Sequence, residues 1–188
     1  HCIFKTTDGS FKCRKVFNSV MDWDSTKNNI KFPLLLQHFE GWVIKTEKEN
    51  FDPKKATFMD FSINQNSSTQ FMYILPFSKT EALVEYTLFS EQLLETDKYK
   101  SALKDYLSSS GILNYQIKSR ESGKIPMTCY PFFELNTKNI LNIGSAGGWS
   151  KPSTGYTFKN IDRNPSSILD FLKEDRSFKE FLKKDRFW

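Results

Sequence analysis

The segment LNIGSAGGWSKPSTGYTFKN, residues 141–160, has the composition of a ligand-binding turn. A short apolar strand leads into glycines that would let the backbone approach a ligand where a Cβ would collide: Gly144, Gly147 and Gly148. A helix that opens in the Pro-Ser-Thr-Gly run would expose the N–H groups of Thr154 and Gly155 at its positive end, which suits phosphate and flavin oxygens. A tight strand-to-helix turn without a ligand would use the same residues, so a second feature is needed.

Two carboxylic acids lie in apolar surroundings that favour proton donation. Glu85 is part of LVEYTLF, and Asp60 is part of FMDF. A buried carboxylate without a partner is driven toward its neutral form, and a neutral carboxylic acid can donate a proton. Strand alternation could instead point Glu85 to solvent together with Leu83 and Thr87, so both interpretations stay open.

Other reactive side chains give weaker signals. His38 and Gln37, in LLLQHFEGW, could line a site, although a hydrogen-bonded core histidine fits the same pattern. No Ser-His-Asp arrangement, Walker loop or set of metal ligands is recognisable. The chemistry is therefore expected to involve the two acids and the glycine segment, with no metal.

The three cysteines, Cys2, Cys13 and Cys129, lack the spacing of a zinc site or redox motif. Cys2 and Cys13 could face each other across a hairpin that turns at Asp8-Gly9. We expect free thiols in a reducing cytoplasm.

Composition predicts a packed globular protein, because the 188 residues are 38% hydrophobic and 15% aromatic. The formal net charge of +5 arises from interspersed basic and acidic residues, so no nucleic-acid partner is expected. No apolar run reaches the roughly 20 residues that span a bilayer, and no signal peptide is visible. We expect a cytoplasmic protein with peripheral membrane contact.

Periodicity predicts a sheet followed by helices. Segments rich in Phe, Tyr, Val and Ile are expected to be extended: 16–20, 32–44, 56–63, 70–77, 82–89, 112–125 with an interruption at Ser122-Gly123, and 140–143. Short polar links at 64–69 and 78–81 predict an antiparallel meander. Helical spacing predicts a helix over 90–109 and another from about Pro152. It also predicts an amphipathic tail with these residues on one side: Ile168, Leu169, Leu172, Phe178, Phe181 and Leu182.

The order of segments resembles that of the lycopene cyclases, a family of the flavin-dependent oxidoreductase superfamily, and most of all the bacterial single-chain type. The matching pieces are QHFEGW (37–42), MDF (59–61), FMYILPFSKTEALVEYT (71–87), GKIPM (123–127) and NIGSAGGWSKPSTGYTFKNI (142–161). Their order and spacing agree over most of residues 16–162.

The resemblance implies an α+β fold that is a fragment of an α/β flavoprotein. An antiparallel substrate-domain sheet would adjoin the C-terminal part of a Rossmann-like FAD-binding domain, and the N-terminal lobe with its G-x-G-x-x-G turn would be missing. Residues 1–31 would be a hairpin and connector, and residues 32–128 the substrate-binding sheet with one helix. Residues 129–165 would contact the flavin, and residues 166–188 would form the helical tail.

The resemblance also implies a reaction. Family members have an essential glutamate in an L-E-E-T-like strand, which Glu85 matches, while Tyr86 replaces the acid that follows. Glu85, with Asp60 as the second candidate, would protonate a terminal double bond of lycopene or a related linear carotene. A six-membered ring would close through a carbocation, which would lose a proton to give a β-ionone ring without net redox change. Reduced FAD would stabilise the cation, and NAD(P)H would only keep the flavin reduced.

The glycine segment corresponds to the family's second flavin-contact motif, which reads G-D-A-x-x-x-x-x-P-x-x-G in related hydroxylases. Ser145 replaces the aspartate, which makes a hydroxylase a poorer match. The matched positions are Gly144, Ala146, Gly147, Pro152, Thr154 and Gly155. We therefore expect Gly147→Val to lower flavin retention through a clash of the new Cβ with the ligand.

The sheet would roof a long apolar tunnel whose aromatic walls could hold a cation: Phe58, Phe61, Phe71, Tyr73, Phe77, Tyr86 and Phe89. Two other functions stay open. A flavin monooxygenase or prenyl reductase of the same architecture would not need an acid on the meander. A carotenoid- or lipid-binding module would need no catalytic group.

Overall fold

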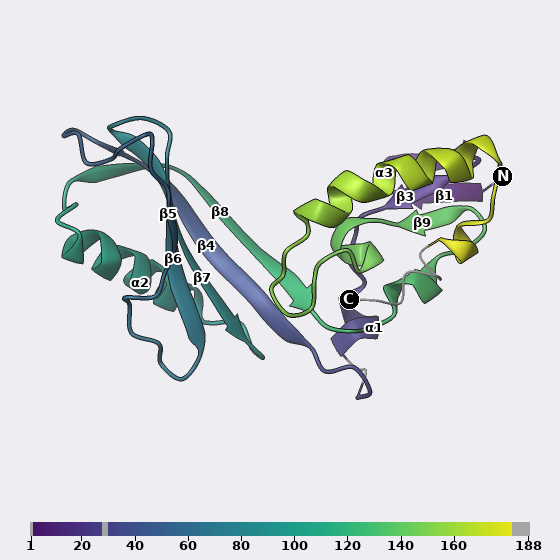
Figure 1. Cartoon of the computed structure of the whole chain (residues 1–188), viewed down its shortest axis with the longest axis horizontal. Helices are drawn as coiled ribbons and strands as arrows, with labels where there is room; N and C mark the ends of the chain where they lie inside the picture. The colour runs from purple at the N-terminus through teal and green to yellow at the C-terminus, as the bar shows by residue number, and fades with distance from the viewer. Residues whose placement is uncertain (1, 28–29, 182–188) are drawn as a thin grey trace. The chain divides into compact units, whose positions relative to one another are not determined.

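The computed structural model describes residues 2–27 and 30–181, and the chain divides into two compact units. Unit 1 combines residues 1–34 with residues 126–188, and unit 2 is the continuous stretch 35–125 (Figure 1). Unit 2 lies inside the range 32–128 expected for the sheet. Unit 1 joins the two ends of the chain in one body.

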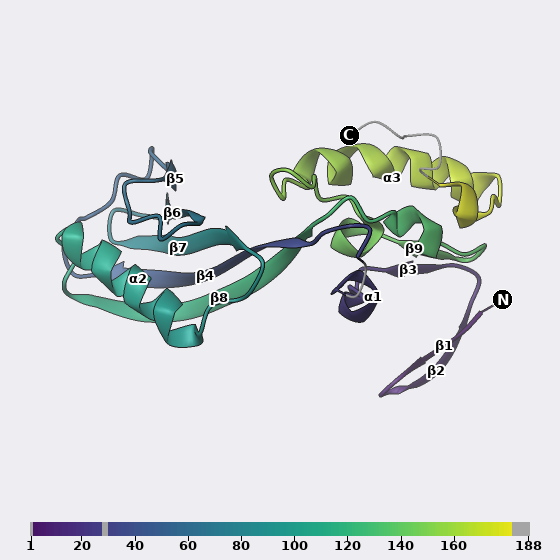
Figure 2. The ribbon, with the colours of Figure 1, turned by 90° about the horizontal axis from the view of Figure 1, so that it is seen from below.

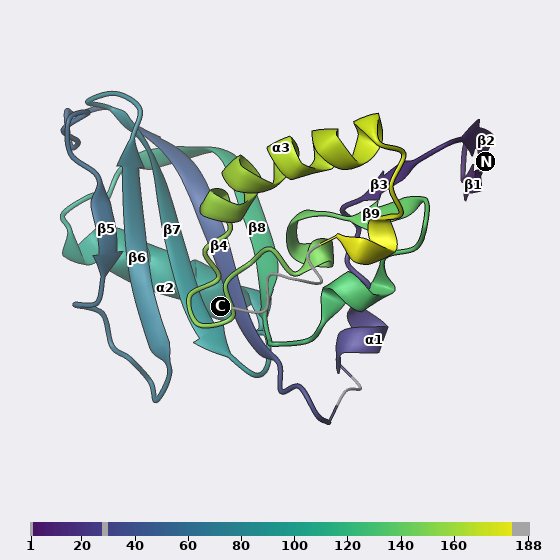
Figure 3. The same cartoon turned by 45° about the vertical axis from the view of Figure 1, so that its right-hand side comes forward.

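Unit 2 is built on a five-stranded sheet with the strand order β5-β6-β7-β4-β8 (Figure 3). Its strands are β4 (Leu35–Thr46), β5 (Thr57–Asp60), β6 (Thr69–Pro76), β7 (Glu81–Ser90) and β8 (Tyr115–Met127). Strands β5, β6 and β7 pair antiparallel in sequence order, which confirms the predicted meander. Strand β4 pairs antiparallel with β7 and therefore lies between β7 and β8.

Helix α2 (Thr96–Ser109) covers one face of this sheet (Figures 2 and 3). Its buried residues Tyr99, Leu103 and Leu107 recur every four positions and so form one stripe. Alternate residues of β7 face this stripe. The resulting core consists of Trp42, Ile44, Met72, Val84, Tyr86, Leu88, Tyr99, Leu103, Leu107 and Ile112. The opposite face of the sheet therefore carries the odd-numbered residues of β7.

Unit 1 holds a parallel pair, β3 (Val16–Asn18) with β9 (Ile140–Asn142), and a hairpin of β1 (Cys2–Thr6) with β2 (Gly9–Cys13). The hairpin brings Cys2 opposite Cys13, as predicted, and both are free thiols. The remaining elements are α1 (Trp23–Lys27), η1 (Phe132–Leu135), η2 (Gly144–Gly147), α3 (Phe158–Lys173) and η3 (Phe178–Glu180). Side chains of β9, of the segment that follows η2, of α3 and of the C-terminal turns form a second core: Leu141, Trp149, Phe171, Phe178 and Phe181.

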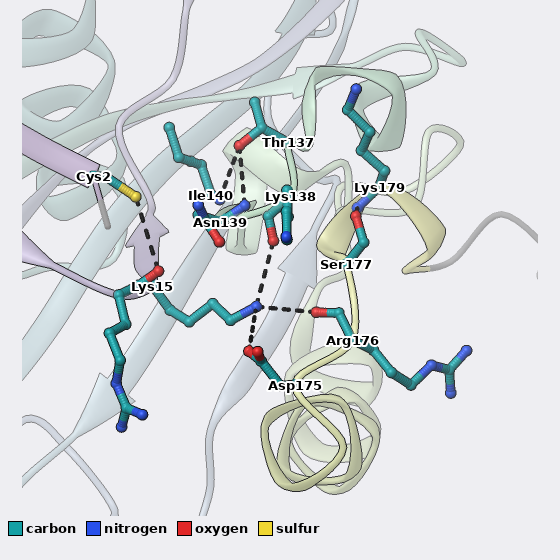
Figure 4. Close-up of polar contacts among 11 residues, drawn as sticks. Cys2, Lys15, Thr137, Lys138, Asn139, Ile140, Asp175, Arg176, Ser177 and Lys179 are labelled. Atoms are coloured by element: carbon teal, nitrogen blue, oxygen red, sulfur yellow. Dashed lines mark hydrogen bonds and ion pairs between the residues drawn. The ribbon is translucent and has the colours of Figure 1, made fainter.

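Lys15 ties the start of β3 to the C-terminal part of unit 1 (Figure 4). Its Nζ lies 3.2 Å from Asp175 Oδ1 and donates to the backbone carbonyl of Arg176 at 3.0 Å. The same ammonium lies 5.0 Å from the centre of the Phe178 ring. The parallel pair is thus held in place by segments far apart in the sequence.

Several predicted boundaries are wrong, and three of the differences have a local reason. Helix α2 begins at Thr96 and not at Ser90, because β7 continues to Ser90. Strand β8 runs through Ser122-Gly123 without a break, since Gly123 makes room for a neighbour: a Cβ there would lie 2.6 Å from Phe39 Cζ. Helix α3 begins at Phe158 and not near Pro152, because residues 151–156 close a turn on the carbonyl of Lys151.

The buried side of α3 also differs from the prediction. Asn160, Asn164 and Phe171 are its buried residues, whereas Leu169 and Leu172 are exposed. Phe178 and Phe181 are buried as expected, and Leu182 lies outside the described residues. In the described parts of the chain, no helix combines the length and the hydropathy needed to cross a bilayer.

Candidate acid site and glycine segment

Glu85 lies on the sheet face opposite α2. Its neighbours Val84 and Tyr86 belong to the core under the helix, so alternation points Glu85 to the other side. Two residues stand directly opposite it on adjacent strands, Gly41 of β4 and Tyr73 of β6. The Glu85 side chain is half-buried. Thr87, its neighbour on the same face of β7, is fully buried. The interpretation that sent Glu85 to open solvent is therefore wrong.

The environment of Glu85 favours its protonated form. Burial is the main cause that raises the pKa of Glu85. The Thr87 hydroxyl, whose Oγ1 lies 2.6 Å from Glu85 Oε1, donates to the carboxyl group and opposes this shift. The charge of Glu121 and a hydrogen bond with that residue raise the pKa of Glu85 further. A carboxylic acid in this setting can hold a proton that an exposed glutamate would release.

Glu121, from β8, is a site residue that the sequence analysis missed. Its side chain reaches across β4 at Gly41, where a Cβ would lie 3.1 Å from Glu121 Cγ and 3.3 Å from Glu121 Oε1. A glycine inside a strand often marks such a close approach. Gly41, within the QHFEGW motif, was the signal that could have indicated a neighbouring side chain at this position.

Aromatic rings line the same face beside Glu85. Phe71 makes edge-to-face contacts with Tyr73 at 5.2 Å, Phe61 at 5.4 Å and Phe89 at 5.6 Å between ring centres. Phe58 contacts Tyr73 in the same way at 5.4 Å. Most of the expected aromatic wall is thus one connected group of rings.

Two of the expected wall residues lie elsewhere. Tyr86 is in the core under α2, where its hydroxyl donates to Gln70 Oε1, because it follows Glu85 in the strand and must point the opposite way. Phe77 lies just beyond the end of β6 and is exposed.

His38 is a core histidine, as one of the two interpretations held. Its Nε2 lies 2.7 Å from Ser90 Oγ, and its Nδ1 lies 2.6 Å from the Tyr99 hydroxyl. Burial lowers the pKa of His38, so the ring is neutral at pH 7. Gln37 lies opposite Phe89 and so shares the face of Glu85; its Oε1 is buried without a hydrogen-bond partner among the described residues. Gln37 is therefore the better candidate to contact a ligand.

Asp60 does not join Glu85. Its Oδ2 accepts a hydrogen bond from the Tyr106 hydroxyl of α2 at 2.7 Å, and its Oδ1 accepts one from the Ser62 N–H at 2.9 Å. Hydrogen bonds from Ser62 and Tyr106 lower the pKa of Asp60. An ionised carboxylate that holds β5 against α2 is poorly suited to donate a proton, so a catalytic role for Asp60 stays a prediction that these contacts do not support.

The glycine segment begins where β9 ends. Asn142 is held by the Asn136 side chain, whose Oδ1 accepts from its N–H at 2.9 Å, and by Asn18 of β3 at 2.8 Å. The chain then forms η2, which has no side-chain cap at its start. Gly144 has a φ of +57°, and a Cβ there would meet no atom within 4 Å. Gly144 therefore combines a conformation that favours glycine with open space in which a ligand could approach.

Gly147 is needed for a different reason from the one predicted. A Cβ on Gly147 would lie 2.3 Å from the backbone oxygen of Asn142 and 2.9 Å from Trp149 Nε1. The expected clash is therefore with the protein itself and not with a ligand. Trp149 is buried, and its Nε1 has no hydrogen-bond partner among the described residues.

The Pro-Ser-Thr-Gly run does not form a helix end. The N–H groups of Thr154 and Gly155 both donate to the Lys151 carbonyl, at 3.2 Å and 2.8 Å, so neither is free for a ligand. Gly155 has a φ of +68°, which allows this turn. Pro152 belongs to the same turn, and Ala146 is buried within η2. Contact of these residues with a flavin stays a prediction, but the mechanism through free N–H groups is wrong.

Comparison with known proteins places these features in context. A family model described as "Lycopene cyclase protein" matches residues 3–181. A curated lycopene beta-cyclase from a Paracoccus species is 27% identical over 144 residues, which is 74% of this chain and 37% of that protein. A crystal structure of a geranylgeranyl bacteriochlorophyll reductase-like protein from Thermoplasma acidophilum matches with a TM-score of 0.60 and 13% identity, over 95% of this chain and 48% of that one. The chain thus spans less than half the length of either relative, and the second match shows a shared fold.

Proposed function

Because this chain belongs to the lycopene cyclase family, we propose that it contributes the catalytic acid of an enzyme that cyclises linear carotenes such as lycopene. Glu85 would transfer its proton to a terminal double bond of the substrate, breaking its O–H bond and forming a C–H bond. The resulting carbocation closes a six-membered ring and then loses a proton, which gives a β-ionone ring with no net redox change. The observation that carries this proposal is that Glu85, whose pKa is raised, lies beside a group of aromatic rings.

The contacts of Glu85 suggest which oxygen carries the proton. Thr87 Oγ1 donates to Glu85 Oε1, so that oxygen is occupied as an acceptor and the proton belongs on Oε2. The neighbouring Tyr73, which is partly exposed, has an aromatic ring that can attract a cation. This face can thus supply the proton and also stabilise the charge that follows.

The glycine segment fits a flavin in part. Gly144 leaves open space, the start of η2 has no side-chain cap, and the buried Trp149 Nε1 is a donor without a partner among the described residues. We propose that Gly144 and Ala146 contact FAD directly and that Gly147 shapes the turn between them and Trp149. Pro152, Thr154 and Gly155 would contribute through atoms other than their backbone N–H groups. When bound, reduced FAD would supply electron density that stabilises the cation, and NAD(P)H would keep it reduced.

A rival function has some support. The structural neighbour is described as reductase-like, so a prenyl reductase of the same fold is the second candidate. A reductase would not need an acid on this sheet face, and the protonated state favoured at Glu85 therefore argues for cyclisation. We further propose that the enzyme works at the cytoplasmic membrane surface, because its substrate is a hydrocarbon.

The test uses lycopene-accumulating bacteria that express the complete protein carrying this chain. We expect β-carotene from the wild type and from Glu47→Gln, a control at an exposed glutamate. Glu85→Gln should leave lycopene unchanged while the purified protein keeps its flavin absorbance. Cyclisation by Glu85→Gln near the wild-type level would rule out the assignment, and reduced instead of cyclised products would favour the reductase.

A further inference from the structure

A second carboxyl group approaches Glu85 from β8. Strand β4 lies between β7 and β8, and its residue opposite Glu85 is Gly41. Glu121 passes over this glycine, with its Cγ and Oε1 at 3.1 Å and 3.3 Å from the position of a Cβ. The absence of a side chain on β4 at this point therefore opens a path from one glutamate to the other.

The direction of the Glu121 side chain needs an explanation. Glu121 is an exposed residue and could extend into water, yet it lies toward another acid. Two ionised carboxylates close to each other repel, so the pair is favoured when one of them carries a proton. The charge of Glu121 and its hydrogen bonding both raise the pKa of Glu85, which agrees with such a pair.

We propose that Glu85 and Glu121 form a carboxyl pair that holds one proton across Gly41, with Glu121 as the positioning residue that keeps Glu85 in its acid form. Its role in ring closure rests on the proposed function. Once Glu85 has given its proton to the substrate, the two carboxylates carry two negative charges beside the new cation. Their repulsion favours the return of a proton to the pair and so resets the acid.

The other groups that face Glu85 cannot replace Glu121 in this role. From β6 comes Tyr73, whose pKa is raised by burial and by the charge of Glu85, so it is neutral. From β4 comes Gly41, which has no side chain, and on β7 the neighbours are Leu83 and Thr87. Glu121 is thus the charged residue that faces Glu85 from the strands beside it.

The pair can be tested without substrate or flavin, by carbon-13 NMR titration of the Glu85 side-chain carboxyl in the 188-residue chain. In the wild type, Glu85 should titrate above an ordinary glutamate. Glu121→Gln should shift that titration toward lower pH, because the second negative charge is gone. Glu47→Gln, which removes the same charge from an exposed position, should leave it unchanged.

A second variant covers the case in which Glu121→Gln disturbs the fold. Gly41→Ala keeps both acids but places a methyl group 3.1 Å from Glu121 Cγ and 3.0 Å from Leu83 Cδ1, so the Glu121 side chain has to shift from its position over β4. It should also shift the Glu85 titration toward lower pH. A Glu85 titration that stays at its wild-type midpoint in both variants would overturn the proposal.

Activity measurements separate this inference from the proposed function. If the complete enzyme cyclises lycopene, Glu121→Gln should move the alkaline limb of its pH profile to lower pH, since Glu85 would lose its proton earlier. If the enzyme does not cyclise lycopene but the NMR titrations shift as expected, the pair exists and the proposed function is wrong. An unshifted pH profile in an active Glu121→Gln enzyme would contradict the pair and leave the function standing.

Discussion

At the scale of single residues, the main feature of the proposed site is an acid whose pKa is raised by burial. Glu85 lies at a half-buried strand position with one hydroxyl donor and a second acid nearby. Such a site costs folding stability, because the ionised form is disfavoured in the folded chain but not in the unfolded one. The proposed function of Glu85 and the stability of the fold therefore oppose each other at this residue.

This opposition predicts a pH-dependent effect of Glu85→Gln on stability. The pKa of Glu85 is raised above 4.5 in the folded state. The contribution of Glu85 to the free energy of unfolding is therefore complete below pH 4.5 and is lost as the pH rises through the folded pKa. Glutamine cannot ionise and can still accept the Thr87 hydrogen bond. We expect Glu85→Gln to be more stable than the wild type at pH 8 and equally stable at pH 4, as measured by urea unfolding. A difference that does not change with pH would contradict this account.

For His38 we expect the opposite dependence of folding stability on pH. Burial lowers the pKa of His38 below 6.5, so its contribution to stability is complete above pH 6.5 and is lost as the pH falls through the folded pKa. The wild type should therefore lose stability between pH 7 and pH 5, and His38→Gln should show a smaller loss over that range. The check is the urea midpoint at each pH, and equal losses in both proteins would assign the effect to other groups.

At the scale of elements, glycines decide where segments can approach each other. Gly41 lets Glu121 cross β4, and Gly123 admits the Phe39 ring against β8. In unit 1, Gly147 lets η2 fold back onto the carbonyl of Asn142, whereas Gly144 faces open space. Gly144 and Gly147 are thus required for different reasons, although they belong to the same sequence motif.

The two glycines of η2 should respond differently to alanine. Gly144→Ala adds no clash and should cost about 1–2 kcal/mol of stability through its left-handed conformation. Gly147→Ala places a methyl group 2.3 Å from a backbone oxygen and should cost clearly more. Thermal unfolding of the chain measures both. Equal costs would show that η2 can relax around a Cβ at Gly147.

At the scale of the whole molecule, the chain forms two units with separate cores. The core under α2 draws all its residues from positions 42–112, inside unit 2, and the second core draws its residues from positions 141–181, inside unit 1. Unit 2 is one continuous stretch, whereas unit 1 needs both ends of the chain. We therefore expect the two units to differ in their ability to fold alone.

Residues 35–125 expressed alone should fold and unfold cooperatively. Leu103→Ala, at a fully buried position, should cost about 2–5 kcal/mol both in this piece and in the whole chain. Phe178→Ala, in the other core, should destabilise the whole chain without changing the spectroscopic signals of unit 2. Circular dichroism and urea unfolding of the two parent chains and these variants provide the test. An unfolded 35–125 piece would show that unit 2 depends on the rest of the chain.

Local rules were enough to predict part of this molecule. Alternation and turn residues identified the meander, and the spacing of apolar residues identified most of α2, because both patterns depend on neighbours in the sequence. The order and spacing of five matching segments, which include the strand of Glu85 and the glycine segment, indicated the family. The face that Glu85 and Thr87 share also follows from the period of a strand.

Only the tertiary structure decided the partners of these residues. Strand β4 inserts between β7 and β8, and this non-local pairing brings Glu121 over Gly41 toward Glu85. The packing of α2 on the opposite face takes Asp60 to Tyr106, and the pairing of β6 with β7 brings Tyr86 to Gln70. The backbone of Asn142, and not a ligand, explains Gly147. Sequence patterns report the direction in which a side chain points, whereas the residue that it meets depends on the order of strands and on the elements that cover them.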